Sequence, residues 1–297
     1  MLDDYSETFT AVMAAVIVTG PTPHIASEAA YETKGLGRSA TQPPCECAIV
    51  RKLPPEETPD GRPGYLLVAF DRKAKHLREC LALRLRKGTL PYPQTAAFDG
   101  LGTLAAKYDE AEMIDLHGTV VQRFADGFDK EETRDGRTLM ILPRMDGPMS
   151  VERTYRTLRA VTGGMFLIYG TSDEVLDAAM RATAAAAAVE GFDGLVTAKC
   201  AASGSKVGGI NDTDMVATTN HRCCPSLRDQ VDDSLVPDDV TRIYEIIVSG
   251  PTEEAVRAGM AAGMRVAAAD ESVVGIGTAN YGGKLGSGQI PLRDLVG

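Results

Sequence analysis

Four apolar runs recur along the chain, and each is followed by a stretch whose apolar residues are spaced as on one face of a helix. The runs begin near residues 12, 65, 165 and 244. Short runs rich in β-branched residues indicate strands, whereas apolar residues at i, i+3, i+4 and i+7 indicate amphipathic helices. The sequence therefore predicts four strand–helix pairs, with strands over Ala11 to Thr19, Tyr65 to Phe70, Met165 to Tyr169 and Arg242 to Gly250.

The last of these pairs is the most sharply defined. Thr252 is a suitable N-cap and is followed by two acidic residues, which favour the first turn of a helix. A further strand is expected over Ser272 to Thr278, and a glycine-rich loop over Asn280 to Gly288. This part of the chain therefore predicts a βαβ unit that ends in a polar loop.

The segments between the pairs are less regular. Asp71 is expected to cap the second helix, and Pro54 to Gly64 to form a rigid loop. His117 to Phe124 and Arg137 to Leu142 are predicted to pair as antiparallel strands around a turn at Asp135-Gly136. Residues 201–239 contain polar and glycine clusters and are expected to be mostly loop.

Internal repetition supports a duplicated fold. Residues 169–174 match residues 249–254 at a shift of 80, and residues 204–208 match residues 282–286 at a shift of 78. Two βαβ units per lobe are the pattern of the split βαβ, ferredoxin-like sandwich.

We therefore predict an α+β protein of two duplicated ferredoxin-like (split βαβ) lobes. The N-terminal lobe, with a β insertion, should occupy residues 1–150, and the C-terminal lobe residues 151–297.

Two Gly-x-Lys-x-Gly loops stand at equivalent points of the repeat. Glycine lets the backbone approach a ligand closely and expose its N–H groups, and lysine supplies a positive charge, so the loops suit carboxylates or phosphates. Neither loop has the glycine spacing of a Walker sequence. Tight turns with an exposed lysine are the alternative interpretation. The candidate binding residues are Ser205, Lys206, Gly208, Asn280, Gly282, Gly283 and Lys284.

Glu245 is the candidate catalytic side chain. It lies within an apolar strand and shares a face with Ile247 and Ser249. Burial disfavours the charged carboxylate, and a protonated acid can donate a hydrogen bond to a developing oxyanion. A glutamate on an edge strand, paired with an arginine, is the alternative.

Composition limits the classes of partner. The chain has 297 residues, of which 44% are apolar and 24% charged, and a formal net charge of -10. The charge argues against nucleic acid or an anionic membrane as partner. No apolar run is long enough to cross a bilayer and the N-terminus lacks a signal-peptide pattern, so we expect a cytoplasmic protein. Six cysteines without regular spacing predict free thiols, no disulfide and no metal site.

These motifs, taken together, resemble one known family, formylmethanofuran:tetrahydromethanopterin formyltransferase. Cys45 to Lys52 departs from the pattern of archaeal members, and the alanine- and arginine-rich composition resembles the methylotrophic-bacterial branch. There the similar protein is one subunit of a formyltransferase/hydrolase complex. The resemblance rests on residues 54–64, 205–208, 244–248 and 280–286 and on Cys224-Pro225.

The resemblance implies two ferredoxin-like lobes and an acyltransferase (EC class 2.3.1). The implied reaction moves a formyl group between N5 of tetrahydromethanopterin and the amine of methanofuran through a tetrahedral oxyanion, with no metal. Glu245 matches the family glutamate that is held to be protonated and bonded to the formyl oxygen. The implied partners are further copies of the chain, hydrolase-type subunits, or both.

Two other functions are compatible with the same sequence: a ligand-binding regulatory protein, and a structural subunit that has lost catalysis. Glu245 facing a cleft would favour the enzyme, whereas Glu245 in a surface ion pair would favour the others.

Overall fold

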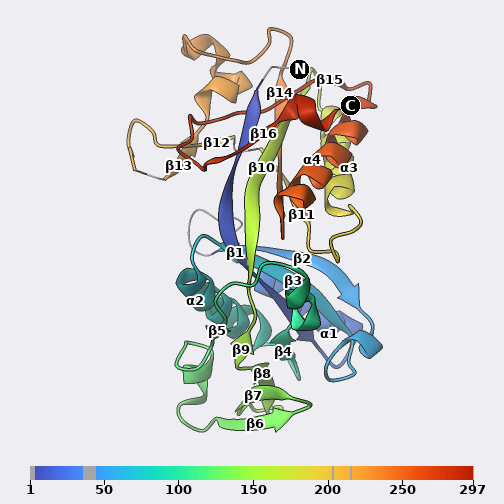
Figure 1. Cartoon of the computed structure of the whole chain (residues 1–297), viewed down its shortest axis with the longest axis vertical. Helices are drawn as coiled ribbons and strands as arrows, with labels where there is room; N and C mark the ends of the chain where they lie inside the picture. Colours follow the sequence, from blue (N-terminus) through green and yellow to red (C-terminus); the bar gives the residue numbers. More distant parts are fainter. Residues whose placement is uncertain (1–3, 36–44, 203, 215, 297) are drawn as a thin grey trace. The chain divides into compact units, whose positions relative to one another are not determined.

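The computed structural model describes residues 4–35, 45–202, 204–214 and 216–296. The chain folds as two compact units. The N-terminal unit is Ala11–Arg159, and the C-terminal unit joins the residues up to Thr10 to Ala160–Gly297 (Figure 1). Within the described residues, no helix has the length and apolar character needed to cross a membrane.

The N-terminal unit begins with a βαββαβ series, in which the strands are ordered β2-β3-β1-β4. The pairs β1–β3, β1–β4 and β2–β3 are antiparallel. The series consists of β1 (Tyr5–Thr19), α1 (Pro23–Gly35), β2 (Glu46–Leu53), β3 (Gly64–Asp71), α2 (Ala74–Arg84) and β4 (Ala96–Asp99).

The polypeptide after β4 extends this sheet. β8 pairs with β4 in parallel, β7 pairs with β8, and β6 forms a hairpin with β7. The added strands are β6 (Lys130–Arg134), β7 (Arg137–Leu142) and β8 (Met149–Glu152), whereas β5 (Ile114–Asp115) and β9 (Thr154–Tyr155) pair in a separate two-stranded sheet.

The C-terminal unit repeats the same series, with the strands ordered β11-β14-β10-β15. Short strands β12 (Ser205–Val207), β13 (Ala217–Thr219) and β16 (Gly288–Pro291) lie outside the series. β16 pairs with residues 5–8 of β1, which explains why the N-terminal residues belong to this unit. The series consists of β10 (Leu158–Gly170), α3 (Val175–Ala187), β11 (Thr197–Ala201), β14 (Arg242–Gly250), α4 (Glu253–Ala268) and β15 (Val273–Gly277).

The four predicted strand–helix pairs are all present, and the mixed α+β class is confirmed. Thr252 caps α4 as predicted, because its hydroxyl accepts a hydrogen bond from the Ala255 amide at 3.1 Å. One face of β14 packs Ile246 and Val248 against α3 and α4 in a single apolar core. The opposite face of this sheet is therefore not covered by α3 and α4.

Two local predictions were wrong. The partner of β7 is Lys130–Arg134 and not His117 to Phe124, because the Asp135-Gly136 turn closes a tight hairpin between directly adjacent segments. The first residue before α2 is Lys73, and the Asp71 carboxylate bonds the Lys73 amide at 3.1 Å instead of capping the helix.

The prediction of no disulfide was also wrong. Cys45 and Cys80 form a disulfide that links the start of β2 to α2. The two residues are 35 positions apart, and only the fold brings them together. Cys47, Cys200, Cys223 and Cys224 are free thiols, as expected.

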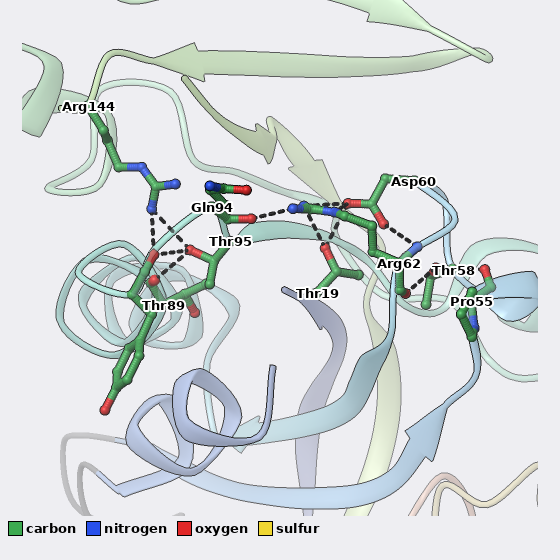
Figure 2. Close-up of polar contacts among 10 residues, drawn as sticks. Thr19, Pro55, Thr58, Asp60, Arg62, Thr89, Gln94, Thr95 and Arg144 are labelled. Carbon is green, nitrogen blue, oxygen red and sulfur yellow. Dashed lines mark hydrogen bonds and ion pairs between the residues drawn. The ribbon is translucent and has the colours of Figure 1, made fainter. Parts of the chain in front are cut away.

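The rigid loop over residues 54–64 is anchored by Arg62, whose guanidinium binds Asp60 of the loop itself and reaches two other parts of the unit (Figure 2). It donates to the Asp60 carboxylate at 2.6 Å, to the Thr19 hydroxyl at 3.0 Å and to the Gln94 carbonyl. Thr58 bonds the carbonyls of Pro55 and Arg62. These side-chain hydrogen bonds, together with a backbone bond from the Gly20 amide to the Pro63 carbonyl at 3.1 Å, hold the loop in place.

Candidate active site

Glu245 lies in the middle of β14, opposite Leu167 of β10 and Ala201 of β11. Its neighbours Ile246 and Val248 face α3 and α4, whereas Ile243 and Ile247 belong to an apolar cluster with Met165, Leu167 and Tyr281. Because side chains alternate along a strand, Glu245 shares the face of Ile243 and Ile247, away from the helices.

Burial favours the protonated form of the Glu245 carboxyl group. The residue is 8% exposed. Burial raises the pKa of its carboxyl to about 7, and the positive charge of Lys199 opposes this effect. Near neutral pH a large share of the carboxyl groups is therefore protonated and able to donate a hydrogen bond.

A cavity of about 50 Å³ lies against Glu245. This exceeds the ~10–15 Å³ that a cavity needs to hold one water molecule, so a group the size of a formyl can enter it. The cavity is lined, among others, by Met165, Leu167, Asn220, Cys223, Glu245 and Tyr281. Burial raises the pKa of the Cys223 thiol to about 11 and that of the Tyr281 phenol well above its ordinary value. Both groups are therefore neutral at physiological pH.

The segment between β11 and β14 covers this face of the sheet. It carries β12, β13 and two short 3₁₀ turns, and it supplies Asn220 and Cys223 to the cavity. In Figure 1 this orange segment lies on the side of β14 away from α3 and α4. The long segment predicted as a loop over residues 201–239 thus forms one wall of the Glu245 cavity, through residues such as Asn220 and Cys223.

Lys206 lies in β12, opposite Thr218 of β13. Its ammonium nitrogen is 3.0 Å from His221 Nδ1, and His221 Nε2 is 3.2 Å from an oxygen of Asp233. Gly208 follows the strand with φ of 75°, a conformation that favours glycine. The first predicted glycine–lysine loop is therefore a strand of a small hairpin, with a glycine on each side, rather than a loop.

The second predicted loop is built around a buried carboxylate, that of Glu7. Glu7 is 1% exposed and accepts hydrogen bonds from three backbone amides of the loop. These are the amides of Tyr281 at 2.6 Å, Gly283 at 2.8 Å and Leu285 at 3.1 Å. The Gly283 amide, which we expected to face a ligand, is thus directed at Glu7. Asn280 donates through its side chain to Asp4, and Lys284 is exposed.

Tyr281 connects the two predicted loops. Its hydroxyl donates to the carbonyl of Ser205 at 2.7 Å, and its ring lines the Glu245 cavity. Ser205, the 280–286 loop and Glu245 are thereby brought together, whereas Lys206 and Lys284 do not line the cavity.

Four residues of this site escaped the sequence analysis. Tyr281 is the one that could have been found, because it lies inside the Asn-Tyr-Gly-Gly-Lys motif that the sequence analysis had already singled out. Glu7, Asn220 and Cys223 have no local pattern that distinguishes them. Glu7 in particular acts on residues more than 270 positions away.

Among the described residues, no group of three or more His, Cys, Asp or Glu side chains is arranged to hold a metal ion.

Family models match both parts of the chain. The model described as formylmethanofuran-tetrahydromethanopterin formyltransferase matches residues 1–144, and the model described as the proximal lobe of that protein matches residues 147–295. The chain belongs to the formylmethanofuran–tetrahydromethanopterin formyltransferase family. The resemblance drawn from the sequence motifs is therefore confirmed.

Relatives match along nearly the full length. The formyltransferase of Methanothermobacter thermautotrophicus is 39% identical over 294 residues, which cover 99% of this chain and 97% of the relative. That of Methanocaldococcus jannaschii is 37% identical over 298 residues, which cover 99% of this chain and 96% of the relative.

Two solved structures have the same fold. The formyltransferase of Methanosarcina barkeri is 34% identical with a TM-score of 0.78, covering 99% of this chain and 97% of that one. A chain of the formyltransferase/hydrolase complex of Methylorubrum extorquens, solved with methylofuran, is 33% identical with a TM-score of 0.84, covering 99% and 96%.

Proposed function

We propose that this chain transfers a formyl group between N5 of tetrahydromethanopterin and the amine of methanofuran, as an acyltransferase of EC class 2.3.1. One observation carries the proposal: in a chain of this formyltransferase family, a buried glutamate with a raised pKa lines a cavity of formyl size. No observation favours a purely regulatory or structural role over this one.

The proposed reaction is direct. The amine nitrogen attacks the formyl carbon and forms the new C–N bond, while the carbonyl electrons move onto the oxygen. The tetrahedral intermediate collapses when the carbonyl re-forms and the bond to pterin N5 breaks. N5 takes up the proton that the amine releases, so atoms and electrons balance with the two carriers alone.

In this mechanism Glu245 is the catalytic residue. Its protonated carboxyl donates a hydrogen bond to the formyl oxygen, and this bond strengthens as negative charge develops on that oxygen. The apolar face around Ile243 and Ile247 supports the role, because it keeps the acid neutral and the hydrogen bond free of competing water.

The remaining candidates are proposed to bind the two carriers. We place Lys206 and Lys284 near anionic portions of the carriers, with Ser205, Gly208, Asn280, Gly282 and Gly283 shaping the two loops. The Tyr281–Ser205 bond supports a joint role, since it ties both loops to the edge of the Glu245 cavity.

We further propose that the chain consists of two duplicated ferredoxin-like lobes, residues 1–150 and residues 151–297. The support is the shared strand order: β2-β3-β1-β4 in one unit corresponds element by element to β11-β14-β10-β15 in the other.

The partners are proposed to be hydrolase-type subunits, further copies of this chain, or both. The Methylorubrum extorquens relative was solved within a formyltransferase/hydrolase complex, which supports the first. A cytoplasmic location is proposed as well. The four free thiols support it, whereas the Cys45–Cys80 disulfide is uncommon in that compartment.

The direct test is a formyl-transfer assay of the purified chain, alone and together with its co-purifying partners. Transfer from N5-formyl-tetrahydromethanopterin to methanofuran, lost in Glu245→Ala, is expected. Binding of both carriers without any transfer, with or without partners, would contradict the proposal.

A further inference from the structure

The N-terminal unit contains a second, larger cavity, of about 790 Å³, which the proposed formyl transfer does not use. This lies within the ~300–1,000 Å³ typical of small-molecule sites. Phe124 and Met145 in its wall are exposed to solvent. The cavity is therefore accessible, and its wall is mainly apolar, made by Leu90, Pro91, Pro93, Phe124, Pro143 and Met145.

Charge is distributed unevenly around this cavity. Arg86, Lys87 and Arg144 line it, against a single carboxylate, that of Asp146. One oxygen of Asp146 already accepts the Gln94 amide at 2.6 Å. The excess of two positive charges (three cations less one carboxylate) contrasts with the net charge of -10 of the whole chain, so composition does not explain it.

Arg86 and Lys87 lie on a π-helical turn, Leu85–Thr89. The Leu90 amide bonds the Leu85 carbonyl at 2.8 Å, five residues back. Such widened turns are rare and occur often at functional sites. Neither Arg86 nor Lys87 forms an ion pair within the part of the chain that the structure describes.

Arg144 is a buried cation with spare hydrogen-bonding capacity. Its side chain is 7% exposed, and Nε lies 3.2 Å from Asp146. Nη1 donates to the carbonyls of Leu90 and Tyr92 and to the Thr95 hydroxyl, the last of which can be followed in Figure 2. Nη2 is buried without a hydrogen-bond partner among the described residues. A buried guanidinium that is only partly bonded is costly, and a nearby anion reduces that cost.

We propose that this cavity binds a small molecule with an aromatic or aliphatic body and one anionic group, a carboxylate or phosphate. The apolar wall takes up the body, while Lys87, Arg86 and the field of Arg144 hold the anion. Lys87 is exposed, so it can move toward the ligand without breaking a bond.

The test uses the full chain and two fluorescent probes. Anilinonaphthalene sulfonate has an aromatic body and one anionic group, and N-phenyl-1-naphthylamine has the same body without the charge. The anionic probe is expected to saturate one site per chain and to bind more tightly than the neutral one. Lys87→Gln should weaken the anionic probe about fivefold, as for loss of ~1 kcal/mol of charge attraction near water, and leave the neutral probe unchanged.

Matched variants locate the site. Phe124→Ala should weaken both probes, whereas Phe128→Ala and Lys130→Gln, which alter exposed residues outside the cavity, should weaken neither. Equal affinities for the two probes, or equal effects of lining and control variants, would overturn the proposal. So would absence of probe binding together with a Lys87→Gln change in oligomeric state, which would assign this face to contacts between copies. No turnover is measured, so the result is independent of the formyl-transfer proposal.

Discussion

The two units share one strand order but differ in the connection between their second and third strands. In the N-terminal unit β2 ends at Leu53 and β3 begins at Gly64, and Arg62 fixes the short loop. In the C-terminal unit β11 ends at Ala201 and β14 begins only at Arg242. This longer segment forms one wall of the cavity that Glu245 lines. The comparison teaches that the candidate site comes from one elaborated connection on a shared scaffold.

A second difference lies on the third strand itself. On β3, Tyr65, Leu67 and Ala69 belong to the core with α1 and α2, so the opposite face carries Leu66, Val68 and Phe70, all apolar and buried. The corresponding face of β14 carries Glu245 between Ile243 and Ile247. On β14, one ionisable side chain thus occupies a face that is otherwise apolar. The apolar surroundings exclude water from the Glu245 carboxyl, and this desolvation raises its pKa.

The largest effect is expected when this distinguishing acid is removed. Glu245→Ala should lower kcat about 10²–10³-fold with carrier binding little changed, because one donor to the oxyanion is lost. Glu245→Gln keeps a donor and should retain part of the activity. Steady-state kinetics and calorimetric binding measure the two effects, with the exposed Glu254→Ala as control. Near wild-type transfer by Glu245→Ala would contradict the mechanism.

The second largest effect is expected in the pH dependence of kcat, compared between the wild type and Glu245→Gln. Because the donor is the protonated acid, kcat should fall as pH rises through about 7, and Glu245→Gln should lack this fall. The methanofuran amine titrates equally in both variants, so the difference between their pH–rate profiles isolates Glu245. Identical profiles would assign the pH dependence to another group.

The same protonation affects stability. The folded-state pKa is raised from 4.5 to about 7, so the folded protein holds an extra proton between these values. The stabilisation, at most roughly 3 kcal/mol, is complete below about pH 4.5 and is lost as pH rises through about 7. Denaturant unfolding at pH 5 and pH 8 should show this loss in the wild type and not in Glu245→Gln.

Removing the carboxylate inside the second loop should have a moderate effect. Glu7→Gln offers one acceptor oxygen and turns an N–H group toward the backbone amides that Glu7 binds, so we expect KM to rise about 3- to 10-fold with kcat nearly unchanged. Hydrogen exchange of the amides of Tyr281 and Gly283 should accelerate. The exposed Glu271→Gln serves as control. Unchanged exchange would show that the loop keeps its shape without Glu7.

The smallest effects are expected for the two lysines. Lys206→Ala and Lys284→Ala should each raise KM about threefold and lower kcat less, because contacts to carrier tails are alike in the ground and transition states. Lys130→Ala is the matched control. A collapse of kcat alone would place the lysines at the reacting centre instead.

The strand–helix pairs could be predicted because each is encoded locally, by apolar periodicity and by caps such as Thr252. Glu245 could be singled out for a similar reason, since a carboxylate within an apolar strand is visible in the sequence itself. The long segment after β11 showed no pattern from which its position over Glu245 could be deduced.

What escaped prediction depends on contacts between distant residues. Cys45 and Cys80 have no characteristic spacing, and their pairing exists only because the fold buries both residues in the same core. Glu7 looked like an ordinary polar residue before the first predicted strand. Its role follows from the pairing of β1 with β16, which sequence periodicity does not report.

The position of Asp4 to Thr8 determines whether the C-terminal unit can be produced as a separate fragment. Tyr5 to Thr8 pair with Gly288–Pro291, and the Asp4 carbonyl accepts the Leu292 amide at 3.2 Å. A fragment that begins at residue 160 would lack both this strand and Glu7. A split version of the protein should therefore recover an ordered 280–286 loop only when a peptide spanning residues 4–10 is supplied in trans or fused, through a linker, after residue 297.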